Sequence, residues 1–361
     1  MATRLVLLAH GQFSPLGSKT ANCVIRYRQR DVVAVLDRDR AGETAQSVLG
    51  FGGAIPVVGR LGDCAEAKPT ELLIGIAPPG GGLPPAWRED IREAIGLGMD
   101  VSSGLHVFLA DDREIAASAR ARGVQIRDLR KPPEDPRLPT GALKTAPFKI
   151  LLTVGTDCNA GKMTAAWEIA AAMRRLGRKA AFAATGQTGI FLGGRGIAVD
   201  RVISDFVAGA TETLIVEVAR ADDAEIVVVE GQGSLSHPAY SGVTLSLLHG
   251  AMPHAMVLCH HVGRRDHAHY DGFPLPPIEE SIEAYERLAA FVRPARVVGV
   301  AANGIGLTPS DFERHCRDLE EVLEIPIADP VSGIGGGADA LARAALHALD
   351  AACGHGDGTS T

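Results

Sequence analysis

The sequence predicts an α/β protein with two doubly wound, mostly parallel sheets, one in each half of the chain. The length of 361 residues exceeds one average domain and suits about two. Short apolar runs alternate with helical patterns along both halves, which is typical of parallel strands joined by helices. The 42 glycines suit the many tight turns that such an architecture needs.

The first domain is expected at residues 1–130. Its apolar runs predict strands at 5–9, 32–36, 55–58, 72–76, 101–109 and 124–126. Residues 131–147 follow as a proline-rich linker, since they contain Pro132, Pro133, Pro136 and Pro139 and show no apolar periodicity.

The second domain is expected at residues 148–352, before a flexible tail rich in glycine, serine and threonine at 353–361. Strands are predicted at 149–154, 179–184, 226–229, 255–259 and 297–302. Helices are predicted at 165–176, 203–218 and 278–291. The order strand, glycine-containing loop, helix, strand defines this half.

Charge and cysteine content limit the class of partner. The net charge is −7 and basic residues are scattered, which argues against a nucleic acid or an anionic membrane and favours a small molecule. The six cysteines form no CxxC pair, so neither a disulfide framework nor a zinc cluster is predicted. The apolar run at 5–9 is too short for a signal peptide or membrane span, and we expect a cytoplasmic protein.

The segment 155–164, GTDCNAGKMT, predicts a phosphate-binding loop between a strand and a helix. Successive backbone N–H groups and the helix dipole can hold anionic oxygens, and a lysine adds a point charge. The residues expected to hold a nucleotide-containing ligand are Gly155, Thr156, Asn159, Ala160, Gly161, Lys162, Met163 and Thr164.

This loop departs from the usual GxxxxGK[ST] pattern. Five residues separate Gly155 from Gly161, and Met163 stands where a magnesium-binding hydroxyl is normal. A thioether is a poor ligand for a hard cation. Either Thr164 takes over that role, or the loop binds phosphates without magnesium, which is the interpretation we favour.

The segment 230–240 follows a predicted strand, so its polar groups emerge at the carboxyl edge of the sheet, where ligands bind. Glu230 is a candidate base, although it can equally brace the loop or bind magnesium if ATP is used. His237 is a second candidate base, with a structural role as its alternative. Ser234 is a candidate for proton transfer or oxyanion binding, and Gln232 and Tyr240 are candidate substrate ligands.

Further polar residues are candidates for substrate binding. Gln187 and Thr188 follow the second strand of this half in a glycine-rich segment, and Arg195 is a candidate anion clamp unless it lies on a surface turn. Asp205 and Glu212 share one face of a predicted helix and are expected to be solvated. Asn303 ends a strand and can read an adenine edge.

In the first domain, Lys19 and Arg26 are candidates to hold an amino-acid carboxylate, with capping by Ser18 and ordinary surface cations as the alternative. Asp37 ends the second strand, but the first strand is not followed by GxGxxG, so NAD is not predicted. His249 has a weak claim to a role. The run His260, His261, His267 and His269 lacks zinc-helix spacing, and no metal site is predicted.

Four segments in order resemble the DUF1611 family: GTDCNAGKMT, ATGQTGI at 184–190, VEGQGSLSHPAYSGVTLSLLHG at 229–250, and AANGIGL at 301–307. The resemblance covers nearly the whole chain and implies a Rossmann-like amino-terminal domain followed by a P-loop domain. The P-loop spacing is also similar to dethiobiotin synthetase, where the aspartate helps catalysis, so Asp157 is a candidate catalytic residue. In that enzyme a threonine follows the lysine, and Met163 does not match it.

A branch of the DUF1611 family acetylates the amine of D-glutamate with acetyl-CoA, so the resemblance implies an amino-acid N-acetyltransferase and a dimer. Coenzyme A carries phosphates that a loop without magnesium can hold. The alternative is an ATP- and Mg²⁺-dependent ligase or kinase of the dethiobiotin-synthetase type, against which Met163 argues. A nucleotide-sensing regulator is a third, minor hypothesis.

Overall fold

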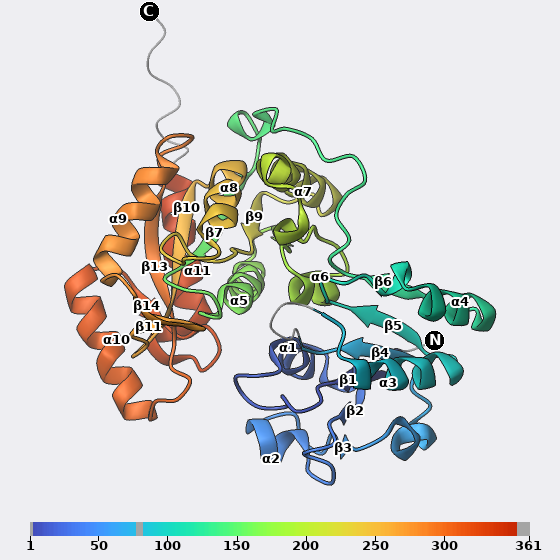
Figure 1. Cartoon of the computed structure of the whole chain (residues 1–361). Coiled ribbons are helices and arrows are strands. Elements are labelled where there is room, and N and C mark those ends of the chain that lie inside the picture. Colours follow the sequence, from blue (N-terminus) through green and yellow to red (C-terminus); the bar gives the residue numbers. More distant parts are fainter. Residues whose placement is uncertain (1–2, 77–81, 352–361) are drawn as a thin grey trace, which may run out of the picture. The chain divides into compact units, whose positions relative to one another are not determined.

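The computed structural model describes residues 3–76 and 82–351, and the predicted tail at 353–361 lies outside them (Figure 1). The chain divides into two compact units. The first comprises Met1–Lys131 together with Ile190–Gly194, and the second comprises Pro132–Gly189 and Arg195–Thr361. Each unit contains one six-stranded sheet.

The sheet of the first unit is entirely parallel, in the order β3-β2-β1-β4-β5-β6. Its strands are β1 (Leu5–Leu8), β2 (Val32–Leu36), β3 (Val57–Val58), β4 (Glu71–Ile74), β5 (Asp100–Ser103) and β6 (Ile126–Asp128). Strands β1 and β4 are buried along their whole length, as expected for a parallel sheet covered on both faces. The predicted strand at 101–109 is wrong beyond Ser103, because the chain leaves the sheet there and turns into a short 3₁₀ helix at Leu109–Asp111.

Four α-helices connect these strands, and their ends follow local sequence signals. They are α1 (Lys19–Tyr27), α2 (Ala45–Leu49), α3 (Pro85–Gly96) and α4 (Arg113–Arg122). The Asp112 carboxylate caps α4 by accepting from the N–H groups of Glu114 and Ile115, and Gly123 ends the helix in the left-handed conformation. Ser18 precedes α1 without a side-chain capping bond, because its hydroxyl donates to Asn22 instead.

The sheet of the second unit is also parallel, in the order β14-β13-β10-β7-β9-β8. Its strands are β7 (Lys149–Gly155), β8 (Ala180–Ala183), β9 (Ile226–Val229), β10 (Ala255–His261), β13 (Arg296–Asn303) and β14 (Ile327–Ala328). Two further strands, β11 (Asp266–His267) and β12 (Tyr270–Pro274), pair with each other in a separate antiparallel hairpin. The prediction of two mostly parallel α/β sheets is therefore confirmed.

Helices cover both faces of the second sheet (Figure 1). The helices of this half of the sequence are α5 (Lys162–Arg175), α6 (Gln187–Gly193), α7 (Val207–Ala221), α8 (Ser241–Ala251), α9 (Ile278–Ala289), α10 (Pro309–Leu323) and α11 (Gly337–Ala351). Helices α5 and α11 pack together on the sheet, while α7, α8 and α9 pack in sequence along it. The predicted helix at 203–218 is shifted, since residues 204–206 form a 3₁₀ turn before α7.

The proline-rich segment belongs to the second unit from Pro132 onward and packs on α7. Its anchor is Glu212, whose carboxylate accepts from the N–H and hydroxyl of Thr140 and from the N–H of Gly141. Glu212 is only 5% exposed, so the prediction that it lies on a solvated helix face is wrong. Its hydrogen-bond partners Thr140 and Gly141 lie 72 and 71 residues away in the sequence, and for this reason the sequence pattern did not reveal a buried carboxylate.

Helix α6 is divided between the two units. We expected Gln187 and Thr188 in a glycine-rich segment after a strand and predicted no helix there, but both residues begin this helix. Its following residues, Ile190–Gly194, cluster with the first unit, where Phe191 is 6% exposed and belongs to the hydrophobic core. A short piece of the second half of the sequence therefore completes the core of the first unit.

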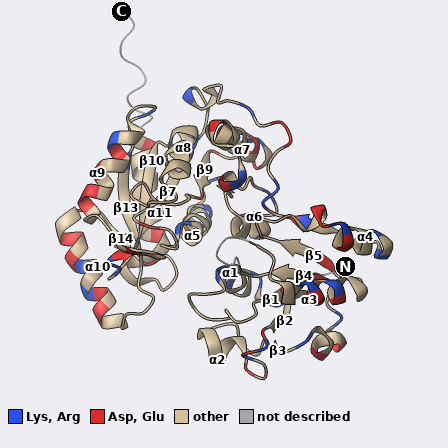
Figure 2. Cartoon of the chain, in the orientation of Figure 1, with Lys and Arg blue, Asp and Glu red and all other residues tan. Residues whose placement is uncertain are grey.

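Charged side chains are distributed without a single-sign patch on the outer helices. Figure 2 shows acidic and basic residues interleaved along α9 and α10. Within the described part of the chain, every helix is too short or too polar to cross a lipid bilayer.

Candidate functional site

The loop between β7 and α5 adopts the tight conformation that its small residues permit. Asn159 and Gly161 have positive φ angles of 53° and 108°, which asparagine and glycine tolerate best. The Nζ atom of Lys162 lies 2.6 Å from the carbonyl oxygen of Asp157 and is buried beneath the loop. The loop is thus folded around its own lysine.

Met163 does not contribute its side chain to the loop surface. It is 1% exposed and packs within the unit, while the next residue, Thr164, is half-buried. The position that carries a magnesium-binding hydroxyl in standard loops is therefore occupied by a buried thioether.

Asp157 is the most heavily bonded side chain of the loop. Its Oδ1 accepts from the N–H of Cys158 at 2.8 Å and lies 3.0 Å from Nδ1 of His267. Its Oδ2 accepts from Nη1 of Arg264 and from the N–H of Ala268, both at 2.8 Å. Burial alone would raise the pKa of Asp157, but these hydrogen bonds together lower it below its ordinary value. Asp157 is therefore a charged carboxylate whose two oxygens both accept hydrogen bonds from protein groups.

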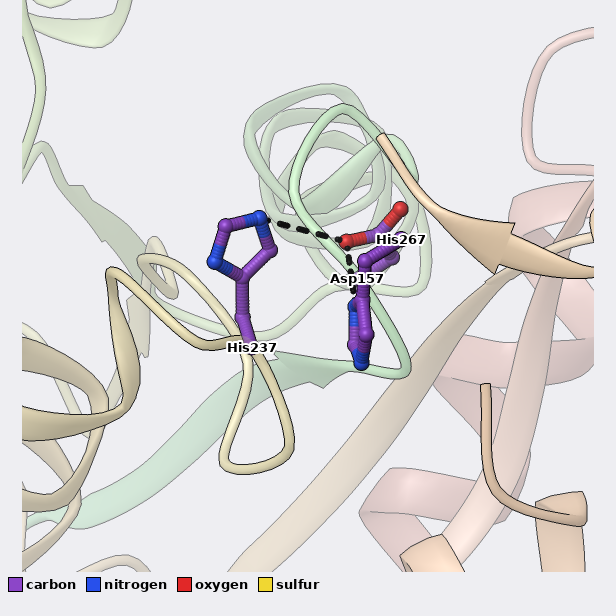
Figure 3. Close-up of side chains that lie close together, drawn as sticks. All are labelled: Asp157, His237 and His267. Atoms are coloured by element: carbon purple, nitrogen blue, oxygen red, sulfur yellow. Dashed lines mark hydrogen bonds and ion pairs between the residues drawn. The ribbon is translucent and has the colours of Figure 1, made fainter. Parts of the chain in front are cut away.

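His267 comes from the β11–β12 hairpin and faces Asp157 (Figure 3). Because a carboxylate only accepts hydrogen bonds, Nδ1 of His267 must carry the proton that it donates. The ring is 3% exposed, and its Nε2 is buried with no hydrogen-bond partner among the described residues. A neutral His267 therefore has an unused lone pair on Nε2.

His237 lies on the other side of Asp157, with Nε2 3.9 Å from Oδ1 (Figure 3). Its Nδ1 accepts from the N–H of Ala239 at 3.1 Å, so Nε2 bears the proton of the neutral ring. The ring stacks on Tyr240 at a centroid distance of 4.5 Å. Burial lowers the pKa of His237 below its ordinary value, although the Asp157 carboxylate opposes this.

The spacing of Asp157, His237 and His267 resembles a metal site, because one ligand atom from each lies within 4.8 Å of the others. Their hydrogen bonds favour another interpretation. Each oxygen of Asp157 already accepts two hydrogen bonds, and one of the four comes from the guanidinium of Arg264. Nδ1 of His237 accepts from the backbone. We interpret Asp157 and His267 as a hydrogen-bonded pair with the His237 ring packed beside it, and we assign no metal to the three residues.

Glu230 lies at the end of β9 and is 3% exposed. Its Oε2 accepts from the N–H groups of Thr185 and Gly186, and its Oε1 lies 3.4 Å from Nε2 of Gln232. These contacts support the alternative role of Glu230, in which its carboxylate braces the loop. Gln232 also donates to Thr185 Oγ1 at 3.0 Å, so both residues connect the ends of β8 and β9.

Two other candidates make contacts with the phosphate loop. Ser234 is 1% exposed and donates to the carbonyl oxygen of Thr156 at 2.9 Å, which ties the segment after β9 to the loop. Asn303, at the end of β13, lies beside the loop as well, since a Cβ atom on Gly161 would be 3.9 Å from its Nδ2. Its Oδ1 accepts from the N–H of Ile305.

The other candidates for substrate binding are Arg195 in the second unit and Lys19 and Arg26 in the first. Arg195 is exposed and forms an ion pair with Asp222. In the first unit, Lys19 is an exposed residue at the start of α1, and the guanidinium of Arg26 lies 4.1 Å from the centroid of the Phe51 ring. Their proposed role in carboxylate binding stays a prediction.

Asp37, at the end of β2, organises the loop after β1. It is 1% exposed and accepts from the N–H groups of Gly11, Phe13 and Asp39. The carboxylate at this position therefore holds backbone amides of its own unit.

Sequence reasoning missed His267 and Arg264 as members of the site. Both lie on or next to a short hairpin that is far from the loop in sequence, at separations of 110 and 107 residues from Asp157. The sequence offered one signal, the density of histidine and arginine at 260–269, but that run was considered only as a metal site, which its spacing did not support.

Comparisons with known proteins agree with this architecture. A model described as a DUF1611 Rossmann-like domain matches residues 38–132, and one described as a DUF1611 P-loop domain matches residues 137–342. The crystal structure of a DUF1611 family protein from Anabaena variabilis is 34% identical, with a TM-score of 0.89, and the match covers 96% of this chain and 99% of that one.

Two curated relatives carry a functional name. A protein of Tritonibacter scottomollicae named D-glutamate N-acetyltransferase is 36% identical over 78% of this chain and 84% of its own length. A protein of the same name from a Pseudoalteromonas species is 36% identical over 74% of this chain and 80% of its own length. On the strength of these matches, the chain belongs to the DUF1611 family.

Proposed function

We propose that this protein is an N-acetyltransferase that transfers the acetyl group of acetyl-CoA to the amine of D-glutamate. The observation that carries the proposal is the 36% identity, over 78% of the chain, to a relative named D-glutamate N-acetyltransferase. The site geometry supports the same chemistry.

The phosphate loop supports coenzyme A as the ligand. Coenzyme A carries a pyrophosphate and a ribose phosphate, which backbone N–H groups at the start of α5 and the ammonium of Lys162 can hold. Lys162 now rests against the carbonyl oxygen of Asp157 at 2.6 Å, and an anion in the loop offers it a stronger, charged partner.

The competing ATP- and Mg²⁺-dependent ligase has weaker support from the site. A magnesium ion needs oxygen ligands, and Met163 supplies none. The carboxylate of Asp157 accepts four hydrogen bonds, including one from the positively charged Arg264. A cation would have to displace these donors before it could bind there.

The proposed reaction requires a free amine. The substrate ammonium loses a proton, its nitrogen attacks the thioester carbonyl carbon, and the carbon–sulfur bond breaks to release coenzyme A. The second proton of the attacking nitrogen leaves for solvent as the amide forms. Backbone N–H donors near the carbonyl would stabilise the oxyanion of the tetrahedral intermediate.

We infer direct transfer to the amine rather than an acetyl-cysteine intermediate. Cys158 lies in the loop with its Sγ 3.7 Å from Nε2 of His237. That nitrogen carries the proton of the neutral ring, because Nδ1 accepts from Ala239. His237 therefore faces the thiol as a donor and has no lone pair there with which to activate it.

The test is an assay of the purified protein with acetyl-CoA and D-glutamate, in which free coenzyme A is measured with a thiol reagent and N-acetylglutamate by mass spectrometry. L-glutamate and D-aspartate are the comparison acceptors, and ATP with Mg²⁺ replaces acetyl-CoA in a parallel reaction. Formation of N-acetyl-D-glutamate only with acetyl-CoA supports the proposal. Nucleotide hydrolysis or ligation with ATP and Mg²⁺, without acetyl transfer, would overturn it in favour of the ligase.

A further inference from the structure

We propose that His267 is the base that removes the proton from the acceptor ammonium, and that Asp157 positions it. This inference rests on the proposed acetyl transfer and assigns its proton-transfer step to a residue outside the two candidate bases that the sequence suggested. It follows from the hydrogen bonds made by four side chains, those of Asp157, His267, Glu230 and His237.

The first step of the argument is the tautomer of His267. Its Nδ1 lies 3.0 Å from Oδ1 of Asp157 and donates to it, which leaves the lone pair of the neutral ring on Nε2. Nε2 is buried and has no hydrogen-bond partner among the residues that the structure describes. A buried nitrogen with an unused lone pair is costly unless a ligand group meets it.

The second step is the rigidity of the positioning carboxylate. Asp157 is fixed by three donors besides His267, namely the N–H groups of Cys158 and Ala268 and the guanidinium of Arg264. A carboxylate held in this way keeps the imidazole in one orientation and one tautomer, and it stabilises the imidazolium that forms when Nε2 takes a proton. The arrangement is that of an aspartate–histidine dyad.

The third step is a comparison with the other candidate bases. Both oxygens of Glu230 have hydrogen-bond donors, from Thr185, Gly186 and Gln232. His237 uses the lone pair of Nδ1 to accept from Ala239, and its Nε2 bears the proton. Of these three residues, only His267 presents a nitrogen lone pair that no group in the described part of the chain uses.

The fourth step places the dyad at the cosubstrate. Asp157 and Cys158 are part of the phosphate loop, so His267 is bonded to the element that we propose holds coenzyme A. His267 lies on the β11–β12 hairpin, whose strands pair with each other. The hairpin lies outside the six-stranded sheet, so it can shift to admit an acceptor to His267, which is 3% exposed, while the hydrogen bonds of that sheet stay intact. The bonds of His267 and Ala268 to Asp157 open in this step and form again around the bound acceptor.

The proton balance is simple. One proton passes from the acceptor ammonium to Nε2 of His267, and the amine then attacks the thioester carbon. When the carbon–sulfur bond breaks, the coenzyme A thiolate takes that proton from the imidazolium, which returns His267 to its neutral form. The second nitrogen proton goes to solvent, so the net reaction releases one proton.

The test compares His267→Asn with His269→Asn in the full chain, using acetyl-CoA and D-glutamate. Asparagine at 267 keeps an N–H donor for Asp157 and lacks the basic nitrogen. His269 is an exposed residue of the same hairpin with a φ of 67°, which asparagine adopts readily, and it serves as the matched control. The measurements are kcat/KM from pH 5 to 10 and the rise in melting temperature caused by acetyl-CoA.

We expect His267→Asn to lower kcat/KM by about 10²- to 10³-fold and to abolish the acid limb of the pH profile. The stabilisation by acetyl-CoA should persist in this variant, which shows that it is folded and binds cosubstrate, and His269→Asn should behave as the unsubstituted protein. Activity of His267→Asn within about twofold of the unsubstituted protein, with the acid limb unchanged, would overturn this inference alone. Absence of acetyl transfer by the unsubstituted protein would overturn the proposed function and the inference together.

Discussion

The hydroxyl of Tyr285 donates to the carbonyl oxygen of Gly155 at 2.8 Å, so helix α9 is bonded directly to the first residue of the phosphate loop. The hydroxyl oxygen of Tyr285 in turn accepts from the N–H of Leu235 at 3.3 Å, and the Tyr285 side chain is 1% exposed. Burial raises the pKa of Tyr285 well above its ordinary value, so the hydroxyl remains a neutral donor. One buried phenol thus holds the loop and the segment after β9 at fixed positions.

We expect Tyr285→Phe to lower the free energy of unfolding by about 1–3 kcal/mol, because it leaves buried backbone groups without their partner. Chemical denaturation of the variant measures this loss. Tyr270→Phe is the matched control, since the Tyr270 hydroxyl makes no hydrogen bond among the described residues. Equal stability of the two variants would contradict the role given to Tyr285.

The loop lysine should be essential for cosubstrate binding. Lys162→Ala removes the buried ammonium, and we expect the stabilisation by acetyl-CoA to disappear, since a ligand raises the melting temperature only by binding the folded state. Lys179→Ala is the control, because Lys179 is exposed and paired with Asp223 on the surface. Thermal denaturation with and without acetyl-CoA checks the prediction, and an undiminished shift in Lys162→Ala would refute it.

Direct transfer predicts that the loop thiol is dispensable. Cys158→Ser should retain kcat within about threefold of the unsubstituted protein, because the side chain is of similar size and forms no acetyl bond during turnover. Mass spectrometry of the protein quenched during turnover should show no acetylated Cys158. A loss of several orders of magnitude in Cys158→Ser, together with a trapped acetyl-cysteine, would contradict direct transfer.

The packing of residues 132–147 on α7 depends on Gly209. A Cβ atom at this position would lie 1.7 Å from the carbonyl oxygen of Arg137, which is backbone and cannot move aside cheaply. We expect Gly209→Ala to destabilise the protein by about 2 kcal/mol or more. Gly242→Ala in helix α8 is the control, because nothing lies within 4 Å of its added methyl group, and it should be neutral or stabilising.

Stability should fall at mildly acidic pH because of His254. Burial, helped by Arg293 and Lys149, lowers the pKa of His254 from 6.5 to about 4. Its Nδ1 accepts from the N–H of Ile150 at 3.1 Å, which requires the neutral ring. Between these two pKa values the unfolded chain binds a proton that the folded chain does not, so stability decreases as pH falls from about 6.5 toward 4 and is constant with respect to this group above 7.

The change due to this one group is at most about 1.4 kcal/mol per pH unit. Urea denaturation at pH 7, 6 and 5 measures it. His254→Asn keeps an acceptor for Ile150 and removes the titration, so its stability should depend less steeply on pH. Burial also lowers the pKa of His260 to about 4 and lowers the pKa of His237 and His261, so these groups contribute to the slope that remains. Identical slopes in the two proteins would contradict the assignment.

The sequence was sufficient to predict the two sheets and the phosphate loop. The strand at 226–229 and the loop after 149–154 were predictable because a run of buried and mainly apolar residues ends at a polar group or a glycine. Positions at which a polar side chain is buried were not predictable. Glu212 reads as a surface residue of an amphipathic helix, and only the folded chain brings Thr140 and Gly141 to its carboxylate.

The candidate site was predictable on the loop side only. Asp157 and Lys162 belong to a motif in which spacing determines geometry. His267 reaches Asp157 through a hairpin of two short strands, and a two-residue strand such as Asp266–His267 has too few residues to show any periodicity. Its partner therefore depends on tertiary structure that no local pattern encodes.

The placement of Phe191 bears on how the chain can be divided. A fragment that ends at Lys131 contains all six strands of the first sheet and yet lacks the aromatic ring that fills its core. Such a fragment is missing one buried side chain, which residues 190–194 supply from beyond the phosphate loop in the sequence. The ribosome therefore synthesises the phosphate loop before the last part of the first unit.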